Sequence, residues 1–283
     1  MFKYFLVPLV VCMLTLPCHA DEGPVDVHGY NGTTLQFRNW DETHAGWSDI
    51  EYKGSSTTFK LYNLPSTMPP SGISTVAADT GKLSPDKKYV MMLRVDSGEV
   101  VDEQGNKINS EQAHCDAVSL ENGCVTDVGS AFQCDGTWQG QKWKVATGGI
   151  LDSSQKDVPP NQLIKNVSRL PAGDSRSSSL KNWMFMGIPS YMACYPPEKN
   201  ISEFNDFGFY FAEGGEHLLA MQVYNKLLNL APDRVPLKLN VADSLWALGK
   251  HDEAKSFYSA YRNAMLKKGA GGKVPTRIQE RLN

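Results

Sequence analysis

Residues 204–224 have the sequence FNDFGFYFAEGGEHLLAMQVY, and residues 238–258 have the sequence KLNVADSLWALGKHDEAKSFY. The second stretch begins about 34 residues after the first, and the two match at small and aromatic positions. The matching pairs are Gly208 with Ala242, Phe211 with Leu245, Gly215 with Gly249, Ala220 with Ala254, and Tyr224 with Tyr258. Apolar residues recur every three or four positions in both stretches, which predicts paired amphipathic helices.

The small residues recur where the two helices of a repeat would cross closely, and the pattern resembles the tetratricopeptide (TPR) repeat family over about residues 201–268. Phe204 and Phe207 match the large apolar pair of the family's first helix, and Pro232 matches the proline that closes a repeat. The second copy departs from the family at Lys238, Tyr261 and Leu266. The resemblance implies helical hairpins that bind another protein, whereas two ordinary amphipathic hairpins are the alternative.

Two repeats alone bury little apolar surface, because repeat arrays usually need three or more units. We therefore expect residues 274–282 to form a short terminal capping helix after the glycine-rich stretch 269–272. The remainder of the chain would cover the other end of the array. The predicted helical region comprises residues 198–283.

Residues 21–197 are predicted to form a β-rich domain, so the fold class is α+β. Short runs rich in β-branched and aromatic residues alternate with turn residues, for example at 33–38, 56–62, 89–95 and 141–145. Gly105 and Asn106 lie in a predicted hairpin loop over 103–107. No internal period is visible here, so we expect a sandwich-like or irregular β structure. From residue 158, a Pro- and Ser-rich segment is expected to wrap this domain without regular elements.

The first 20 residues have the pattern of a signal peptide. Lys3 precedes an apolar run over residues 5–16, and Cys18 and Ala20 stand three and one positions before Asp21. We therefore expect cleavage near Ala20 and a periplasmic or secreted protein. No later stretch is apolar and long enough to predict stable insertion into a membrane.

Four cysteines remain after this segment, namely Cys115, Cys124, Cys134 and Cys194. An even number in an oxidising compartment predicts two disulfide bonds, for which three connectivities exist. We expect a local Cys124–Cys134 bridge and a long Cys115–Cys194 bridge. The spacing of the cysteines does not match the close ligand pairs of zinc sites, so no metal is predicted.

The composition is that of a globular protein, with 41% hydrophobic and 10% aromatic residues among 283. The 28 basic and 31 acidic residues give a net charge of −3, so there is no basic excess to neutralise the phosphates of a nucleic acid. The familiar catalytic and nucleotide-binding motifs are absent from the sequence, and no cofactor is expected. The chain is therefore predicted not to be an enzyme.

The function favoured by the sequence is that of an exported, non-enzymatic protein-binding protein. An inhibitor or immunity-type protein of the periplasm, which blocks a toxic effector or a hydrolase, fits these features. Its acidic chain would suit a basic partner. Helical geometry alone predicts exposed positions on the inner helix of the first repeat, and it nominates three of them, Asn205, Phe209 and Glu213, as partner-contacting residues.

Two other functions stay open. Residues 40–51 place Asp41, Glu42, Asp49 and Glu51 near two tryptophans, which suits an envelope glycan-binding module or hydrolase with paired acids. The same residues suit a polar loop beside buried aromatic rings. The other alternative is a scaffold of an envelope assembly.

Overall fold

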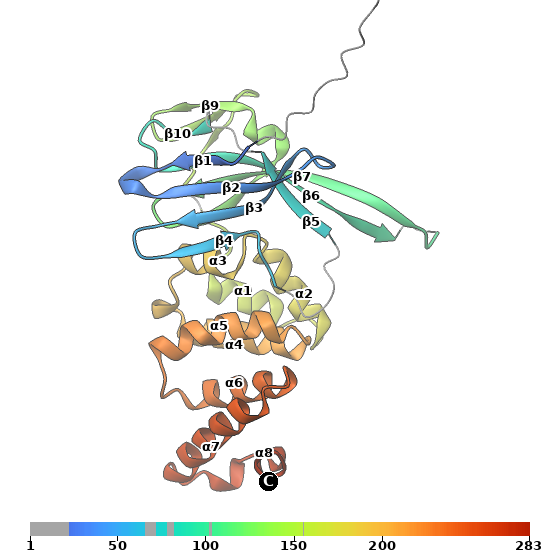
Figure 1. The fold of residues 1–283 in the computed structure, drawn as a ribbon, viewed down its shortest axis with the longest axis vertical. Coiled ribbons are helices and arrows are strands. Elements are labelled where there is room, and N and C mark those ends of the chain that lie inside the picture. Colours follow the sequence, from blue (N-terminus) through green and yellow to red (C-terminus); the bar gives the residue numbers. More distant parts are fainter. Residues whose placement is uncertain (1–22, 66–71, 78–81, 102–103, 155) are drawn as a thin grey trace, which may run out of the picture.

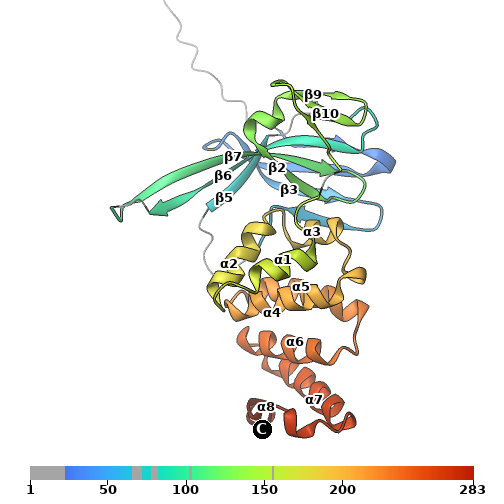
Figure 2. The same ribbon diagram turned by 180° about the vertical axis from the view of Figure 1, so that it is seen from behind.

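The computed structural model describes residues 23–65, 72–77, 82–101, 104–154 and 156–283. The predicted signal peptide at residues 1–20 lies outside these described residues. The fold is α+β, as the sequence predicts, with a curled antiparallel sheet followed by helices (Figures 1 and 2). None of the helices in the described ranges has both the length and the apolar composition needed to cross a membrane.

The larger sheet has eight strands in the described part of the chain. They are β1 (Val25–His28), β2 (Thr34–Asp41), β3 (Gly46–Lys53), β4 (Thr58–Leu61), β5 (Gly72–Ala77), β6 (Tyr89–Val101), β7 (Lys107–Ser119) and β8 (Val125–Ser130). The strand order is β1-β2-β3-β5-β6-β7-β8, and β4 pairs with β3 beside β5. A smaller sheet contains β9 (Gly136–Gln139), β10 (Lys142–Val145) and β11 (Ile150–Leu151).

Alternation along β6 and β7 explains how one sheet contacts two layers. Val90 and Met92 of β6 belong to the main core, whereas Met91 packs with Cys115 and Trp143 in a second cluster beneath the smaller sheet. Because successive side chains of a strand point to opposite faces, both faces of the curled sheet are buried over this stretch. The β6–β7 turn falls where the sequence predicts a hairpin loop, and Gly105 has a φ of 86°.

The helical layer begins earlier in the chain than the sequence predicts. The expectation that residues 158–197 lack regular elements is wrong, because three helices form there: α1 (Pro160–Val167), α2 (Asp174–Trp183) and α3 (Ile188–Cys194). Pro160 and Pro189 lie in the first turns of α1 and α3, where a proline starts a helix instead of breaking it. The serine-rich stretch lies in α2, whose Ser177 and Leu180 are buried.

The remaining helices form two antiparallel hairpins and a short terminal helix. They are α4 (Ile201–Glu213), α5 (His217–Leu230), α6 (Val235–Ala247), α7 (His251–Lys267) and α8 (Thr276–Leu282). Gly208 of α4 lies directly against the ring of Tyr224 in α5, so a Cβ atom at this position would overlap the ring. The sequence predicts a domain boundary after residue 197. Helices α1 and α2 precede this position but pack against α4, which follows it, so the boundary stays a prediction.

One continuous core connects the sheet to the helices. Leu61 of β4, Ile188 and Tyr191 of α3, and Phe204 and Phe207 of α4 belong to the same buried cluster. Tyr191 lies edge-on to both phenylalanines, with ring centroids 6.0 Å apart in each pair. The helix α3 therefore forms the junction between the two regions.

Two disulfides are present, but the predicted pairing is wrong. Cys115 bonds to Cys134, and Cys124 bonds to Cys194. After β8, the short helix η3 (Ala131–Cys134) folds back onto β6, β7 and β8, which brings Cys134 to the middle of β7. Cys124 lies instead in the β7–β8 turn, beside the end of α3.

Candidate functional site

A groove of about 680 Å³ lies at the junction of the sheet and the helices. The β1–β2 turn, the β3–β4 turn, β4 and the β7–β8 turn form its sheet wall. The end of α3, the segment that follows it and one residue of α5 form the helix wall. The groove is therefore built from segments that are far apart in the sequence.

The sheet wall of the groove is aromatic. Tyr52 of β3 and Phe59 of β4 are cross-strand partners whose ring centroids lie 5.2 Å apart. Gly123, with a φ of 79°, lies so close to this pair that a Cβ atom would be 2.6 Å from Phe59 Cζ. A side chain at residue 123 would thus displace the rings. The helix wall adds Met192, Pro196 and Pro197, so both walls offer apolar contact area.

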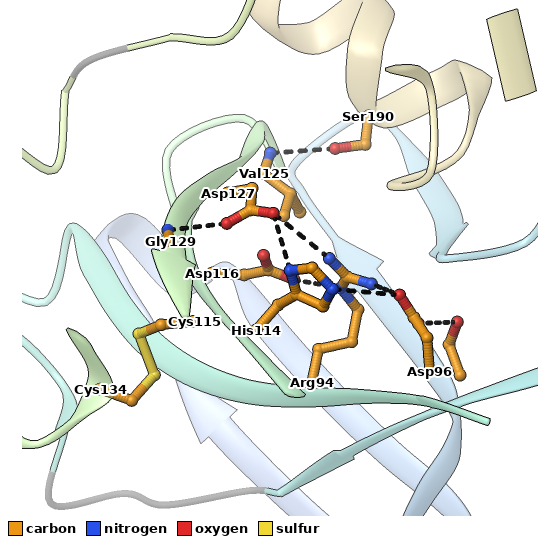
Figure 3. A network of polar contacts seen from close by, with 11 residues as sticks. Arg94, Asp96, His114, Cys115, Asp116, Val125, Asp127, Gly129, Cys134 and Ser190 are labelled. Carbon is orange, nitrogen blue, oxygen red and sulfur yellow. Dashed lines mark hydrogen bonds and ion pairs between the residues drawn. A yellow bond between two sulfur atoms is a disulfide. The ribbon is translucent and has the colours of Figure 1, made fainter. Parts of the chain in front are cut away.

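The floor of the groove is fixed by covalent and hydrogen bonds between the β7–β8 turn and α3. The Cys124–Cys194 disulfide joins the two segments. Ser190 Oγ donates to the Gly123 carbonyl at 2.7 Å and accepts from the Val125 N–H at 3.0 Å, and the second of these bonds appears in Figure 3. The Asn122 amide donates to the Ala193 carbonyl at 3.1 Å. The groove is consequently pre-formed and needs no rearrangement to accept a ligand.

The charged groups around the groove are already paired. Lys88 Nζ lies 2.9 Å from Glu121 Oε1 and 5.2 Å from the centroid of the Tyr30 ring. On the helix side, Lys226 Nζ lies 3.6 Å from Glu198 Oε1. The paired lysines and acids leave the groove without a strong field of one sign. Its chemistry is therefore contact with apolar side chains and hydrogen bonding through the hydroxyls of Ser55, Ser56 and Thr57.

A second polar site lies inside the molecule, on the face of β6 and β7 that carries Val90 and Met92 (Figure 3). Arg94 of β6 has a side chain that is 3% exposed, and its Nε donates to Asp116 Oδ2 at 2.7 Å. Its other nitrogens contact Asp96 and Asp127. The guanidinium also lies 4.3 Å from the centroid of the Phe185 ring, which precedes α3. One cation therefore connects three carboxylates of the sheet to the helical layer.

This buried network contains more acids than bases. His114 Nδ1 lies 3.1 Å from Asp127 Oδ2, and Asp116 Oδ1 is buried with no hydrogen-bond partner. Burial raises the pKa of Asp116 to about 6, although Arg94 opposes the shift. Burial also raises the pKa of Asp157 to about 7, against a hydrogen bond from the backbone of Asp127. The network is consequently a structural junction that responds to pH.

The three residues predicted to contact a partner are in different environments. Phe209 is 44% exposed and lies beside Tyr210 on α4. Asn205 is only 5% exposed and its side chain accepts a 3.4 Å hydrogen bond from Asn240, so the expectation that it is exposed is wrong. Glu213 pairs with Arg176 of α2 at 3.2 Å. Helical geometry placed these side chains without accounting for α2 and α6.

The acidic segment 40–51 lies in the β2–β3 hairpin, and three of its four acids (Asp41, Asp49 and Glu51) pair with basic side chains. Asp41 contacts His44 at 3.0 Å, and Asp49 contacts Lys60 at 2.8 Å. Trp47 is buried and lies edge-on to Trp40, with ring centroids 5.2 Å apart. The structure therefore does not bring a pair of free carboxylates together beside an exposed tryptophan in this hairpin.

Sequence reasoning missed both the groove and the Arg94 network. A signal for the network was present, because Arg94 and Asp96 in β6, and His114 and Asp116 in β7, are ionisable residues two positions apart with an apolar residue or Cys between them. Such spacing places both members of a pair on one face of a strand. No comparable signal marks the groove, since its walls combine turns from distant segments.

Within the described ranges, no group of three or more His, Cys, Asp or Glu side chains is arranged to hold a metal ion. Neither a protein-family model nor a curated protein matches the chain.

Proposed function

We propose that the chain is an exported, non-enzymatic protein-binding protein of the inhibitor or immunity type, which holds a segment of its partner in the groove between the sheet and α3. The observation that carries this proposal is the pre-formed groove itself. Its walls offer tyrosine, phenylalanine, methionine and proline side chains, and aromatic anchors of this kind supply most of the affinity in many protein interfaces.

Engagement of the acids favours binding over turnover. Glu121 and Glu198 line the groove, and each is paired with a lysine. The same lysines and acids are placed to contact charged residues of a partner at the rim, where such pairs govern specificity and association rate.

Export to the periplasm or another oxidising compartment is part of the proposal. The pattern of residues 1–20 supports it, and so do the two disulfides, which persist in oxidising environments. An inhibitor that acts outside the cytoplasm gains from such covalent stabilisation, because the Cys124–Cys194 bond holds together two segments that line the groove.

The helical hairpins α4–α5 and α6–α7 are proposed to be TPR-like repeats that carry a second part of the interface. The resemblance of their sequences supports this, as does the close contact of Gly208 with Tyr224. Phe209 is the exposed aromatic residue of α4 that we assign to partner contact. In this arrangement the groove supplies the anchor and the helices extend the contact area.

The proposal is tested by affinity capture with residues 21–283, at moderate salt, from an extract of the host's envelope and of its competitors' secreted proteins. The expected result is one stoichiometric protein whose activity the bait suppresses. Tyr30→Ala and Met192→Asp should each reduce the affinity for this protein about tenfold or more, because each alters a wall of the groove.

The matched control is Phe132→Ala, which removes a 77% exposed aromatic ring outside the groove. This variant should bind like the wild-type chain. Equal binding by the groove variants and the wild-type chain would contradict the assignment of the site. Retention of cell-wall glycan with no protein would overturn the protein-binding function and favour the glycan-binding alternative.

A further inference from the structure

The β6–β7 hairpin forms an arm that projects from the body of the molecule (Figures 1 and 2). The two strands pair continuously from Tyr89 with Ser119 to Val101 with Lys107. β5 accompanies β6 as far as Gly98, but β8 pairs with β7 only from His114 onward. In the part of the chain that the structure describes, the outer edge of β7 from Lys107 to Ala113 therefore has no neighbouring strand.

This seven-residue edge lacks two features that protect natural sheet edges, a proline and a β-bulge, although it carries the charged residues Lys107 and Glu111. It contains no proline, and the bulge in β7 lies beyond it, between Cys115 and Asp116. Alternate residues of such an edge direct their N–H and C=O groups outward, where they can pair with another strand. Val100 and Ile108 are cross-strand partners near the tip and are 45% and 47% exposed. The arm thus combines a free edge with an exposed apolar pair.

We propose that the arm binds a second copy of this chain, by antiparallel pairing of the two β7 edges about a two-fold axis at Asn109. The sequence of the edge is complementary to itself in this register. Residues equidistant from Asn109 face each other across the axis, so Lys107 of each copy lies opposite Glu111 of the other. Opposite charges at facing positions stabilise a strand pair, whereas like charges destabilise it.

The neighbouring registers lack this match. An axis at Ser110 would place Lys107 opposite Ala113 and Asn109 opposite Glu111. An axis at Glu111 would place the two Glu111 carboxylates opposite each other. Only the Asn109 register of these three pairs both charged residues of the edge with opposite charges.

The apolar pair near the tip supports the same register. Ile108 lies two positions from Ser110, so in the Asn109 register the Ile108 residues of the two copies are diagonal neighbours. Diagonal neighbours on one face of a strand pair lie about 7–8 Å apart, within reach of long side chains. Val100 and Ile108 of one copy would then form one apolar row with the same residues of the other. Side-by-side contact in the dimer would remove part of this row from water.

The dimer leaves the groove accessible. In Figure 1 the arm points away from the β1–β2 turn, which contributes Tyr30 and Thr33 to the groove. The inference is therefore independent of the function proposed for the groove. A paired edge of seven residues is smaller than a standard protein interface, so we expect a dissociation constant in the micromolar range.

The first experiment measures the mass of residues 21–283 by sedimentation velocity from about 1 to 500 μM, a range that brackets the expected dissociation constant. The expected result is a reversible monomer–dimer equilibrium. Asn109→Cys should then form a covalent dimer under mild oxidation, because facing residues have Cα atoms about 4.5–5.5 Å apart. The control is Glu99→Cys on β6, whose two copies would lie three strand spacings apart, about 14 Å, and should not crosslink.

The second experiment exchanges the charges. Lys107→Glu and Glu111→Lys should each weaken dimerisation about tenfold, because both symmetry-related pairs become like-charged at once. The double variant should restore the wild-type constant. Within one chain, Lys107 Nζ also lies 2.9 Å from Glu99 Oε2. Glu99→Gln is therefore the control, because it removes the charge of this contact and leaves the pairs between the two copies intact.

A chain that stays monomeric at 500 μM would overturn the proposal. Equal crosslinking by Asn109→Cys and Glu99→Cys would also overturn it. So would a dissociation constant that is the same for the wild-type chain, both single charge variants and the double variant. The chain could also be monomeric, with residues 107–113 protected from hydrogen exchange only when a different protein is bound. The edge would then pair with a strand of that protein, and the proposal would be wrong.

Discussion

The sheet and the helical hairpins are held together by contacts of different range. On the sheet side, the Cys124–Cys194 disulfide ties the β7–β8 turn to α3 across 70 residues, and the Arg94–Asp116 ion pair joins β6 to β7 across 22 residues. In the hairpins, Gly208 lies against Tyr224, and Tyr258 donates to Asp243 only 15 residues away. The contacts within the hairpins thus link residues that are closer in sequence than those linked by the two contacts on the sheet side.

The disulfides offer the largest test of this difference. Replacing Cys124 and Cys194 by Ala should lower the free energy of unfolding by about 4 kcal/mol, because a loop of 70 residues gains entropy in the unfolded chain. Replacing Cys115 and Cys134, which are 19 residues apart, should cost about 3 kcal/mol. Denaturant unfolding measures both values. A larger loss from the shorter loop would show that the stabilisation comes from packing of the bridge in the folded state and not from chain entropy.

The buried cation gives the next largest effect. Arg94→Met should reduce stability by about 3 kcal/mol at neutral pH, because it leaves buried carboxylates without their counter-ion. The matched control is Arg38→Met, which breaks a partly exposed pair with Asp26 and should cost less than about 1 kcal/mol. Urea titration of both variants decides the comparison. Equal losses would mean that the Arg94 network contributes no more than a surface ion pair.

The helical hairpins should be sensitive to a single methyl group. Gly208→Ala is expected to cost about 2 kcal/mol, because the new Cβ atom overlaps the Tyr224 ring and the hairpin must open. Gly272→Ala is the control, since no atom lies within 4 Å of a Cβ atom built there. Thermal unfolding of both variants measures the difference. Two equal melting temperatures would contradict the close packing of α4 on α5.

The change of stability with pH should be smaller than the three effects above. It should arise in the buried polar network around Arg94. The pKa of Asp157 is raised to about 7 in the folded state. Above about pH 4, Asp157 is therefore protonated to a greater extent in the folded chain than in the unfolded chain. This residue consequently makes the protein less stable as the pH rises from 5 to 8. Asp157→Asn should remove this component and stabilise the chain by about 1 kcal/mol at pH 8, by clearly less at pH 5, and not at all below about pH 4.

The control for this experiment is Asp152→Asn. Hydrogen bonds from Ser154 lower the pKa of Asp152, so its contribution is fully present above about pH 4 and is lost only below it. The stability difference between this variant and the wild-type chain should therefore be constant from pH 5 to pH 8. A pH-independent gain from Asp157→Asn would contradict the assignment of the titration to Asp157.

The sequence predicted the α+β class, four of the strands and the helices after residue 201, because these depend on local period. It did not predict the helices α1 to α3, which precede residue 197. Prolines and serines are typical of loops, and here the prolines lie in the first turns of α1 and α3 while the serines lie in α2. The disulfide pairing also failed, because it depends on how η3 folds back over β7. The groove requires turns whose proximity is set by that same long-range packing.

Hydrogen exchange of residues 21–283 with and without the captured partner would show which region of the chain binds that partner. The groove is built by both regions, so we predict slower exchange in the segments 52–59 and 189–198 of the complex, with weaker protection of α4. Protection confined to α4 and α6, with unchanged exchange at 52–59 and 189–198, would show that the helices alone bind the partner and would contradict the account.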